Sequence, residues 1–144
     1  HWLKNPIWIA VHTGARKSAI AELKYNRDLQ TITFPKMKSE ARARTIPAHP
    51  DIITHLDSWE QNRKASSTIG NQFTLLKQSM GYGEERDFHS FRRTFITELE
   101  NLECPENITA DIVGHKKSTI GYGIYSGGAR LDTMRKWVEK VSFS

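Results

Sequence analysis

The sequence predicts a mainly α-helical α+β domain that carries one small antiparallel β-hairpin or sheet. Two observations lead to this fold class. In most of the chain, apolar residues recur at helical spacing, in stretches bounded by proline, glycine or polar residues. Residues 30–34 instead alternate and are rich in β-branched side chains, and residues 44–47 form a second short extended piece. The 144 residues, 38% hydrophobic and 26% charged, suit a single globular domain that spans 1–144.

The N-terminal part predicts two short helices. Residues 6–12 are apolar and form the first helix. It ends near Gly14, because glycine readily adopts the left-handed conformation that closes many helices. Residues 15–24 form the second helix, with Ile20 and Leu23 on its buried face.

Residues 30–34 and 44–47 predict the two strands of a hairpin. The basic segment 36–42 between them forms a charged tip, and its lack of an Asn-Gly turn leaves the register open. The cations of this region either meet a polyanionic partner or keep the surface soluble. They are Lys36, Lys38, Arg42 and Arg44.

Five further helices are predicted downstream. They start at Pro50, which occupies the first helical position that proline prefers, at Ser67 or Thr68, and at residues 90, 105 and 131. Gly114 closes the fourth of them. The residues expected to face the core are Ile52, Ile53, Leu56 and Trp59, then Phe73, Leu75, Leu76 and Met80, then Phe91, Phe95, Leu99 and Leu102, and finally Leu131, Met134, Trp137, Val138 and Val141.

Charge and cysteine content narrow the function classes. The net charge of +5 favours polyanionic partners. Cys104 is the only cysteine, so we expect no internal disulfide, a packing role for its side chain and a cytoplasmic location. No apolar run approaches the roughly 20 residues that span a bilayer, and no membrane partner is expected. Because the chain starts at His1 without a methionine, we expect an excised domain of a longer protein.

One region of the C-terminal half concentrates the polar groups that phosphoryl transfer needs. His89 and Arg92 lie three positions apart on a predicted helix, so their side chains share one face. A fixed positive charge then stands beside an imidazole that exchanges protons near neutral pH. His115 follows Gly114, and Tyr125 lies ten residues further on in a glycine-rich segment. The region therefore offers a phosphate clamp, proton carriers and an oxygen nucleophile.

Five elements occur in an order that resembles the tyrosine site-specific recombinases, the phage-integrase family. They are Thr13-Gly14-Ala15-Arg16, the basic hairpin that ends in Arg44-Thr45-Ile46-Pro47, His89-Ser90-Phe91-Arg92, Gly114-His115 and Tyr125. The resemblance spans nearly the whole chain. It implies the catalytic domain of a DNA breaking-rejoining enzyme, in which a tyrosine attacks a phosphodiester, forms a 3′-phosphotyrosine and releases a 5′-hydroxyl. It also implies that no metal or nucleotide cofactor is needed.

The resemblance further implies double-stranded DNA as the partner and a homotetramer on that DNA, with a monomer compatible with the isolated domain. The source would be a bacterium or a phage. An N-terminal DNA-binding region of the family is absent from this chain.

The resemblance assigns roles to the matching residues. Arg16 and Arg92 would hold the non-bridging oxygens of the phosphate, because guanidinium groups stay charged and donate forked hydrogen bonds. His89 would handle the proton of the nucleophile Tyr125, and His115 would donate a hydrogen bond to the same phosphate.

Two of these assignments keep an alternative. Residues 35–39, Pro-Lys-Met-Lys-Ser, resemble the Pro-Lys-Thr-Lys-Asn element of the family, which selects Lys38 as the acid for the leaving 5′-oxygen and leaves Lys36 as the second choice. Tyr122 competes with Tyr125 for the role of nucleophile, but Tyr125 suits the His-to-Tyr interval of the family.

One departure and three alternative functions remain. The family usually has a glutamate three residues after the first arginine, where this chain has Ala19, and Glu22 is a candidate substitute one turn on. A type IB topoisomerase shares the same chemistry. A DNA-binding module with decayed catalysis would need basic charge but no tyrosine in register. A zinc site built from His89, Cys104 and His115 matches no common ligand spacing.

Overall fold

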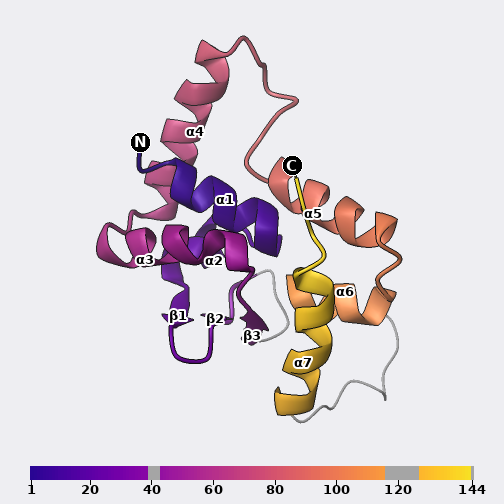
Figure 1. Cartoon of the computed structure of the whole chain (residues 1–144). Helices are drawn as coiled ribbons and strands as arrows, with labels where there is room; N and C mark the ends of the chain where they lie inside the picture. The colour runs from indigo at the N-terminus through magenta and orange to yellow at the C-terminus, as the bar shows by residue number, and fades with distance from the viewer. Residues whose placement is uncertain (39–42, 116–126, 144) are drawn as a thin grey trace.

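Helices surround one small sheet in the computed structural model, which describes residues 1–38, 43–115 and 127–143 (Figure 1). The helices are α1 Lys4–Thr13, α2 Lys17–Glu22, α3 Ile53–Gln61, α4 Ser66–Ser79, α5 Ser90–Asn101, α6 Glu106–Val113 and α7 Gly127–Val138, with a short 3₁₀ helix η1 Pro50–Ile52 before α3. The strands are β1 Lys24–Asn26, β2 Thr31–Phe34 and β3 Arg44–Pro47. The mainly α-helical α+β class is confirmed. No helix in the described part of the chain has the length and hydropathy that a bilayer crossing requires.

Helix α1 is the centre of the helical packing. It contacts α2, α3 and α5, and its Ile9 and Ala10 are completely buried. Gly14 ends the helix in the left-handed region, with φ 71°, and its N–H donates to the carbonyl oxygen of Ala10 at 2.8 Å. The glycine stop that the sequence predicts is therefore confirmed.

The three strands form one antiparallel sheet in the order β1-β2-β3. The predicted hairpin of β2 and β3 is confirmed, and its register pairs Phe34 with Arg44. Strand β1 was not predicted, because the second helix was extended to residue 24 but ends at Glu22. Three residues without an apolar alternation carry no local strand signal. They form a strand because β2 pairs with them and because the N–H of Tyr25 donates to the carboxylate of Glu60 at 3.0 Å.

Helix α4 differs most from the prediction. Its Leu75, Leu76 and Met80 were expected in the core and are exposed, Leu75 by 58% and Met80 by 61%. Only Ile69 is fully buried, while Phe73 makes edge contacts with neighbouring phenylalanine rings. The reason is the direction of the helix. Its first turns contact α2 and Phe73 in its middle meets Phe88 and Phe91, but its last turns extend beyond the body of the domain (Figure 1).

The last helix packs on its own domain. It was predicted over 131–141 and runs from Gly127 to Val138. Met134, Val138 and Val141 are buried, and α7 contacts both β3 and α6. The apolar face of α7 therefore belongs to the core of this domain, which also brings the C-terminal residues back toward α1.

Candidate active site

The turn between α1 and α2 is packed tightly against two other helices. A Cβ placed on Gly14 would lie 2.8 Å from the ring of Phe95 in α5 and 2.9 Å from a methyl group of Val113 in α6. Both distances are shorter than carbon atoms normally show, so any side chain at this position would have to displace Phe95 or Val113. The close approach brings together the ends of α1 and α6 and the middle of α5, three segments far apart in the sequence.

Arg16 leaves this turn as the residue that precedes α2. Its backbone is extended, with φ −76° and ψ 155°, and its side chain is half-buried. The turn is held from inside by Thr13, whose hydroxyl donates to the carbonyl oxygen of Ile9 at 2.7 Å and accepts from the N–H of Ala15 at 3.1 Å. Arg16 is thus placed at the edge of the junction between α1, α5 and α6.

Arg92 occupies the centre of the same junction and is only 2% exposed. Its Nη1 donates to the carbonyl oxygen of Gly14 at 2.7 Å and to that of Val113 at 2.9 Å. Both carbonyls lie at helix ends, where they have no partner within the helix and where the helix dipole favours a cation. The guanidinium therefore joins the segment that carries Arg16 to the segment that carries His115.

His89 lies at the first turn of α5, on the side of Arg92. Partial burial lowers its pKa below the ordinary 6.5, and the positive charges of Arg92 and Arg16 lower it further. The start of the helix is fixed by Asp87, which accepts from the N–H of Ser90 at 3.1 Å. Asp87 also pairs with Arg93, the neighbour of Arg92, at 3.4 Å.

His115 follows the end of α6 and belongs to the same site. Gly114 closes the helix with φ 81°, and the N–H groups of both Gly114 and His115 donate to the carbonyl oxygen of Ala110 at 2.9 Å. Burial lowers the pKa of His115, and next in size come the charges of Arg92 and Arg16. The imidazole is therefore mostly neutral at pH 7 and able to donate one hydrogen bond.

The structure brings four of the predicted site residues together. The positive charges of Arg16 and Arg92 lower the pKa of both His89 and His115. The charge of His89 also lowers the pKa of His115. Two permanent cations and two neutral imidazoles thus share one site. Groups of these types are able to attract a phosphate, donate hydrogen bonds to its oxygens and accept a proton from a hydroxyl.

Arg44 is a member of this region that the sequence did not single out. In the sequence it is one of the basic residues of the hairpin. In the structure it is only 9% exposed, and its Nε donates to the carbonyl oxygen of Ile112 at 3.0 Å. Its charge also lowers the pKa of His115. No local pattern separates it from the exposed Lys36 and Lys38, although its register position opposite Phe34 was a usable signal once the hairpin was assigned.

Comparison with known proteins agrees with these motifs. No protein-family model matches the chain. The chain is similar to the prophage integrase IntF of Escherichia coli (strain K12), with 28% identity over 163 residues that cover 96% of this chain and 34% of that protein. It also has the fold of an integrase from mycobacterium phage Brujita, with a TM-score of 0.70 and 15% identity over 98% of this chain and 52% of that one. A lambda integrase tetramer bound to a Holliday junction gives a TM-score of 0.64 and 20% identity, over 86% of this chain and 44% of that one.

The sequence match and the two fold matches point to the same proteins as the ordered motifs. The chain is similar in sequence to a prophage integrase and has the fold of phage integrases. It spans about a third of the length of the curated relative that it matches.

The remaining predicted site residues lie outside the four-residue site in the described part of the chain. Lys38 and Lys36 are both exposed in the segment after β2, and between them Met37 packs partly against the core. No contact between either lysine and the four site residues is recorded in the described segments, so the choice of Lys38 stays a prediction. Tyr125 and Tyr122 both fall within residues 116–126, outside the part of the chain that the structure describes.

The departure from the family pattern at residue 19 has a structural counterpart. Ala19 is completely buried in α2, whereas Glu22 is exposed at the end of that helix. A carboxylate at position 19 would lie in the core and would need a buried partner. Glu22 is not among the charges that most affect the pKa of His89 or His115, so its role as a substitute stays a prediction.

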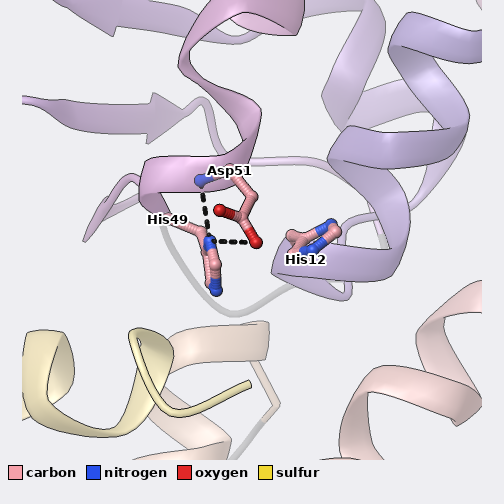
Figure 2. Close-up of side chains that lie close together, drawn as sticks. All are labelled: His12, His49 and Asp51. Atoms are coloured by element: carbon pink, nitrogen blue, oxygen red, sulfur yellow. Dashed lines mark hydrogen bonds and ion pairs between the residues drawn. The ribbon is translucent and has the colours of Figure 1, made fainter. Parts of the chain in front are cut away.

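A second group of titratable side chains, absent from the sequence-based list, lies at the end of α1 (Figure 2). His12, His49 and Asp51 have possible ligand atoms within 4.8 Å of one another, and the described residues form no other such group. Each imidazole is already bonded to backbone, with His12 Nδ1 2.9 Å from the carbonyl oxygen of Trp8 and His49 Nε2 2.7 Å from that of Val141. His49 Nδ1 accepts from the N–H of Asp51 at 3.0 Å.

Both nitrogens of His49 are therefore occupied, and the group stabilises the chain instead of offering a vacant metal site. His49 caps η1 through Asp51 and ties the C-terminal segment to it through Val141. Its position just before Pro50 was the sequence signal for this cap, because the residue before a helix-starting proline is the N-cap.

Proposed function

We propose that the chain is the catalytic domain of a site-specific DNA recombinase that cleaves and rejoins DNA through a covalent 3′-phosphotyrosine. The observation that carries the proposal is the position of Arg92. Its guanidinium is buried and bound to the carbonyl oxygens of Gly14 and Val113, so Arg16 and His115 are held beside it. A preorganised set of cations and neutral imidazoles is what a phosphodiester in an associative displacement requires.

In this mechanism Tyr125 is the nucleophile. Its phenol loses a proton to His89 as the oxygen attacks the phosphorus, because a phenol of pKa near 10 is a weak nucleophile when protonated. The bond from phosphorus to the 5′-oxygen breaks, and Lys38 supplies the proton that converts the leaving oxygen to a 5′-hydroxyl. One phosphodiester bond is exchanged for another, so rejoining is the same reaction run backwards with a new 5′-hydroxyl.

The two arginines and His115 stabilise the transition state. Negative charge accumulates on the non-bridging oxygens during attack, and Arg16, half-exposed at the edge of the site, is placed to meet them. Arg92 supplies a permanent positive charge from its buried position, and His115 donates one hydrogen bond to a phosphate oxygen. Losing one such donor typically costs about 3 kcal/mol of transition-state stabilisation.

We propose double-stranded DNA as the substrate and a homotetramer as the active assembly, acting in the cytoplasm of a bacterial host. The net charge of +5 and the basic hairpin support the first point. The second is supported by the likeness to a lambda integrase that is described as a tetramer bound to a Holliday junction. Exchange of two duplexes requires four strand cleavages, and each protomer supplies a single tyrosine.

The test of this function is covalent trapping. The protein is incubated with a pool of duplexes that carry a randomised core and a nick close to it, so that the short 5′-hydroxyl fragment diffuses away and the adduct accumulates. Wild type and Tyr122→Phe should give an adduct that resists SDS, while Tyr125→Phe should give none and bind the enriched DNA with unchanged affinity. An adduct from Tyr125→Phe, or its loss in Tyr122→Phe, would show that the nucleophile is misassigned.

A further inference from the structure

Arg44 is buried although it belongs to a hairpin whose neighbouring cations are exposed. It is the first residue of β3 and is 9% exposed, whereas Lys36 and Lys38 face solvent. A buried guanidinium is unfavourable unless hydrogen bonds and neighbouring groups compensate for lost hydration. The contacts of this side chain therefore indicate what it stabilises.

Those contacts reach from the sheet to the end of α6. The guanidinium lies over the ring of Phe34, its register partner on β2, with Cζ 4.5 Å from the ring centroid. Its Nε donates to the carbonyl oxygen of Ile112 at 3.0 Å. Since Ile112 lies in the last turn of α6, its carbonyl has no partner within the helix and is a natural acceptor for an arginine.

The guanidinium also sets the space around Gly114. A Cβ at position 114 would lie 2.6 Å from Nη1 of Arg44, so the arginine occupies the volume that a side chain there would fill. The next residue is His115, whose N–H is fixed to the carbonyl oxygen of Ala110. Arg44 thus packs against the turn that precedes His115, while Arg92 binds the neighbouring carbonyl oxygen of Val113.

The arginines that most lower the pKa of His115 are Arg92, Arg16 and Arg44. Those that most lower the pKa of His89 are Arg92, Arg16 and Arg93. The two imidazoles share Arg16 and Arg92 and differ in this third cation. His89 therefore serves as an internal reference for any change made at Arg44.

We propose that Arg44 is a positioning residue for His115, holding the end of α6 through Ile112 and Gly114 so that the imidazole stays at the site formed with Arg16 and Arg92. The inference rests on the proposed function, because the positioned group is a donor to the scissile phosphate. Arg44 itself acts through His115, because its contacts are with Ile112 and Gly114 at the turn before this histidine.

Two variants separate the geometry of Arg44 from its charge. Arg44→Lys keeps the charge but lacks the planar fork that spans Phe34 and Ile112, and Arg44→Gln removes the charge as well. The adduct-formation rate on the enriched nicked DNA should fall about 10- to 100-fold in both variants, because a small displacement of a catalytic donor is enough for such a loss. DNA affinity should stay within about twofold, since the phosphate contacts elsewhere are intact.

A titration followed by NMR gives a second readout, which a general loss of stability would not produce. In Arg44→Gln the pKa of His115 should rise while the pKa of His89 stays unchanged, with signals assigned from His115→Gln. Arg27→Lys and Arg27→Gln are the matched controls, because Arg27 is an exposed arginine of the same sheet region that pairs with Asp57 at 2.8 Å. Both control variants should leave the rate and the two pKa values as in wild type.

Three results would overturn the inference. They are an Arg44→Lys rate within about twofold of wild type, equal pKa changes at His89 and His115 in Arg44→Gln, or failure of Arg44→Lys to fold, which would make Arg44 a residue of the fold in general. If wild type forms no adduct with any DNA, the proposed function fails. An active wild type together with an unaffected Arg44→Lys rejects the positioning role alone.

Discussion

Replacing Gly14 by alanine tests the junction on which the site depends. The substitution has two separable costs. Gly14 has φ 71°, and an L side chain in the left-handed region costs about 1–2 kcal/mol. The new Cβ would also lie 2.8 Å from Phe95 and 2.9 Å from Val113, and such overpacking of a rigid core typically costs about 1–3 kcal/mol.

The chain contains a matched control for the first cost. Gly81 has φ 84°, and a Cβ there would meet nothing within 4 Å. Gly81→Ala should therefore lower the free energy of unfolding by about 1–2 kcal/mol and Gly14→Ala by about 2–5 kcal/mol. Urea denaturation followed by circular dichroism measures both, and the slope m should stay unchanged in a two-state transition.

The rate of covalent adduct formation should also differ between Gly14→Ala and Gly81→Ala. Because Arg92 donates to the carbonyl oxygen of Gly14, a displaced turn moves Arg92 and Arg16 together. Folded Gly14→Ala should form the covalent adduct more slowly than wild type, whereas Gly81→Ala should match it. Equal destabilisation by the two substitutions would refute the close approach of α1, α5 and α6 on which this reasoning is built.

Three further outcomes are expected. Arg92→Lys removes the planar guanidinium whose Nη1 reaches the carbonyl oxygens of both Gly14 and Val113, and an ammonium on the shorter lysine side chain does not reproduce that position. Adduct formation should therefore fall about 10²- to 10³-fold and the free energy of unfolding by about 1–3 kcal/mol, measured by single-turnover trapping and urea denaturation. Loss of the general acid should be rescued by a substrate whose leaving 5′-oxygen is replaced by sulfur, because a thiolate leaves without a proton, and we expect this rescue for Lys38→Ala and not for Lys36→Ala. Acid should destabilise the fold, because burial lowers the pKa of His12 below 6.5, and His12→Gln should weaken this dependence in urea denaturation at several pH values.

The sign of the acid effect follows from proton uptake. The unfolded chain binds the proton of His12 at about pH 6.5, and the folded chain binds it at a lower pH, so the free energy of unfolding falls as the pH drops through 6.5. A pH-independent stability between about pH 5 and 7 would contradict this assignment. Arg27→Lys is the control for Arg92→Lys. If the sulfur substrate rescues Lys36→Ala instead of Lys38→Ala, Lys36 is the general acid.

The local elements were readable because their causes lie within a few residues. Gly14 and Gly114 end helices since glycine adopts a positive φ without strain. The alternating segments 31–34 and 44–47 paired as predicted because one face of each is apolar. The ordered polar motifs also pointed to the integrases that the comparisons found and nominated Arg16, His89, Arg92 and His115, which the fold brings together.

Burial was decided by tertiary packing. Leu75 and Met80 have the apolar character of core residues, yet α4 extends past the body of the domain and leaves them exposed. Arg92 and Arg44 carry full charges and are buried, because the ends of α1 and α6 present backbone carbonyls that satisfy their guanidinium groups. A short stretch of sequence shows that burying a charged side chain is unfavourable, but it does not show which distant group will compensate.

The sequence by itself therefore determined which helices and strands form and which residue types can perform the chemistry. Only the tertiary structure decided which arginine meets which helix end, because the compensating carbonyls of Gly14, Ile112 and Val113 lie 21 to 78 positions away from the guanidinium groups that they bind. Interactions over such separations depend on how the helices pack, and that packing is a property of the whole chain.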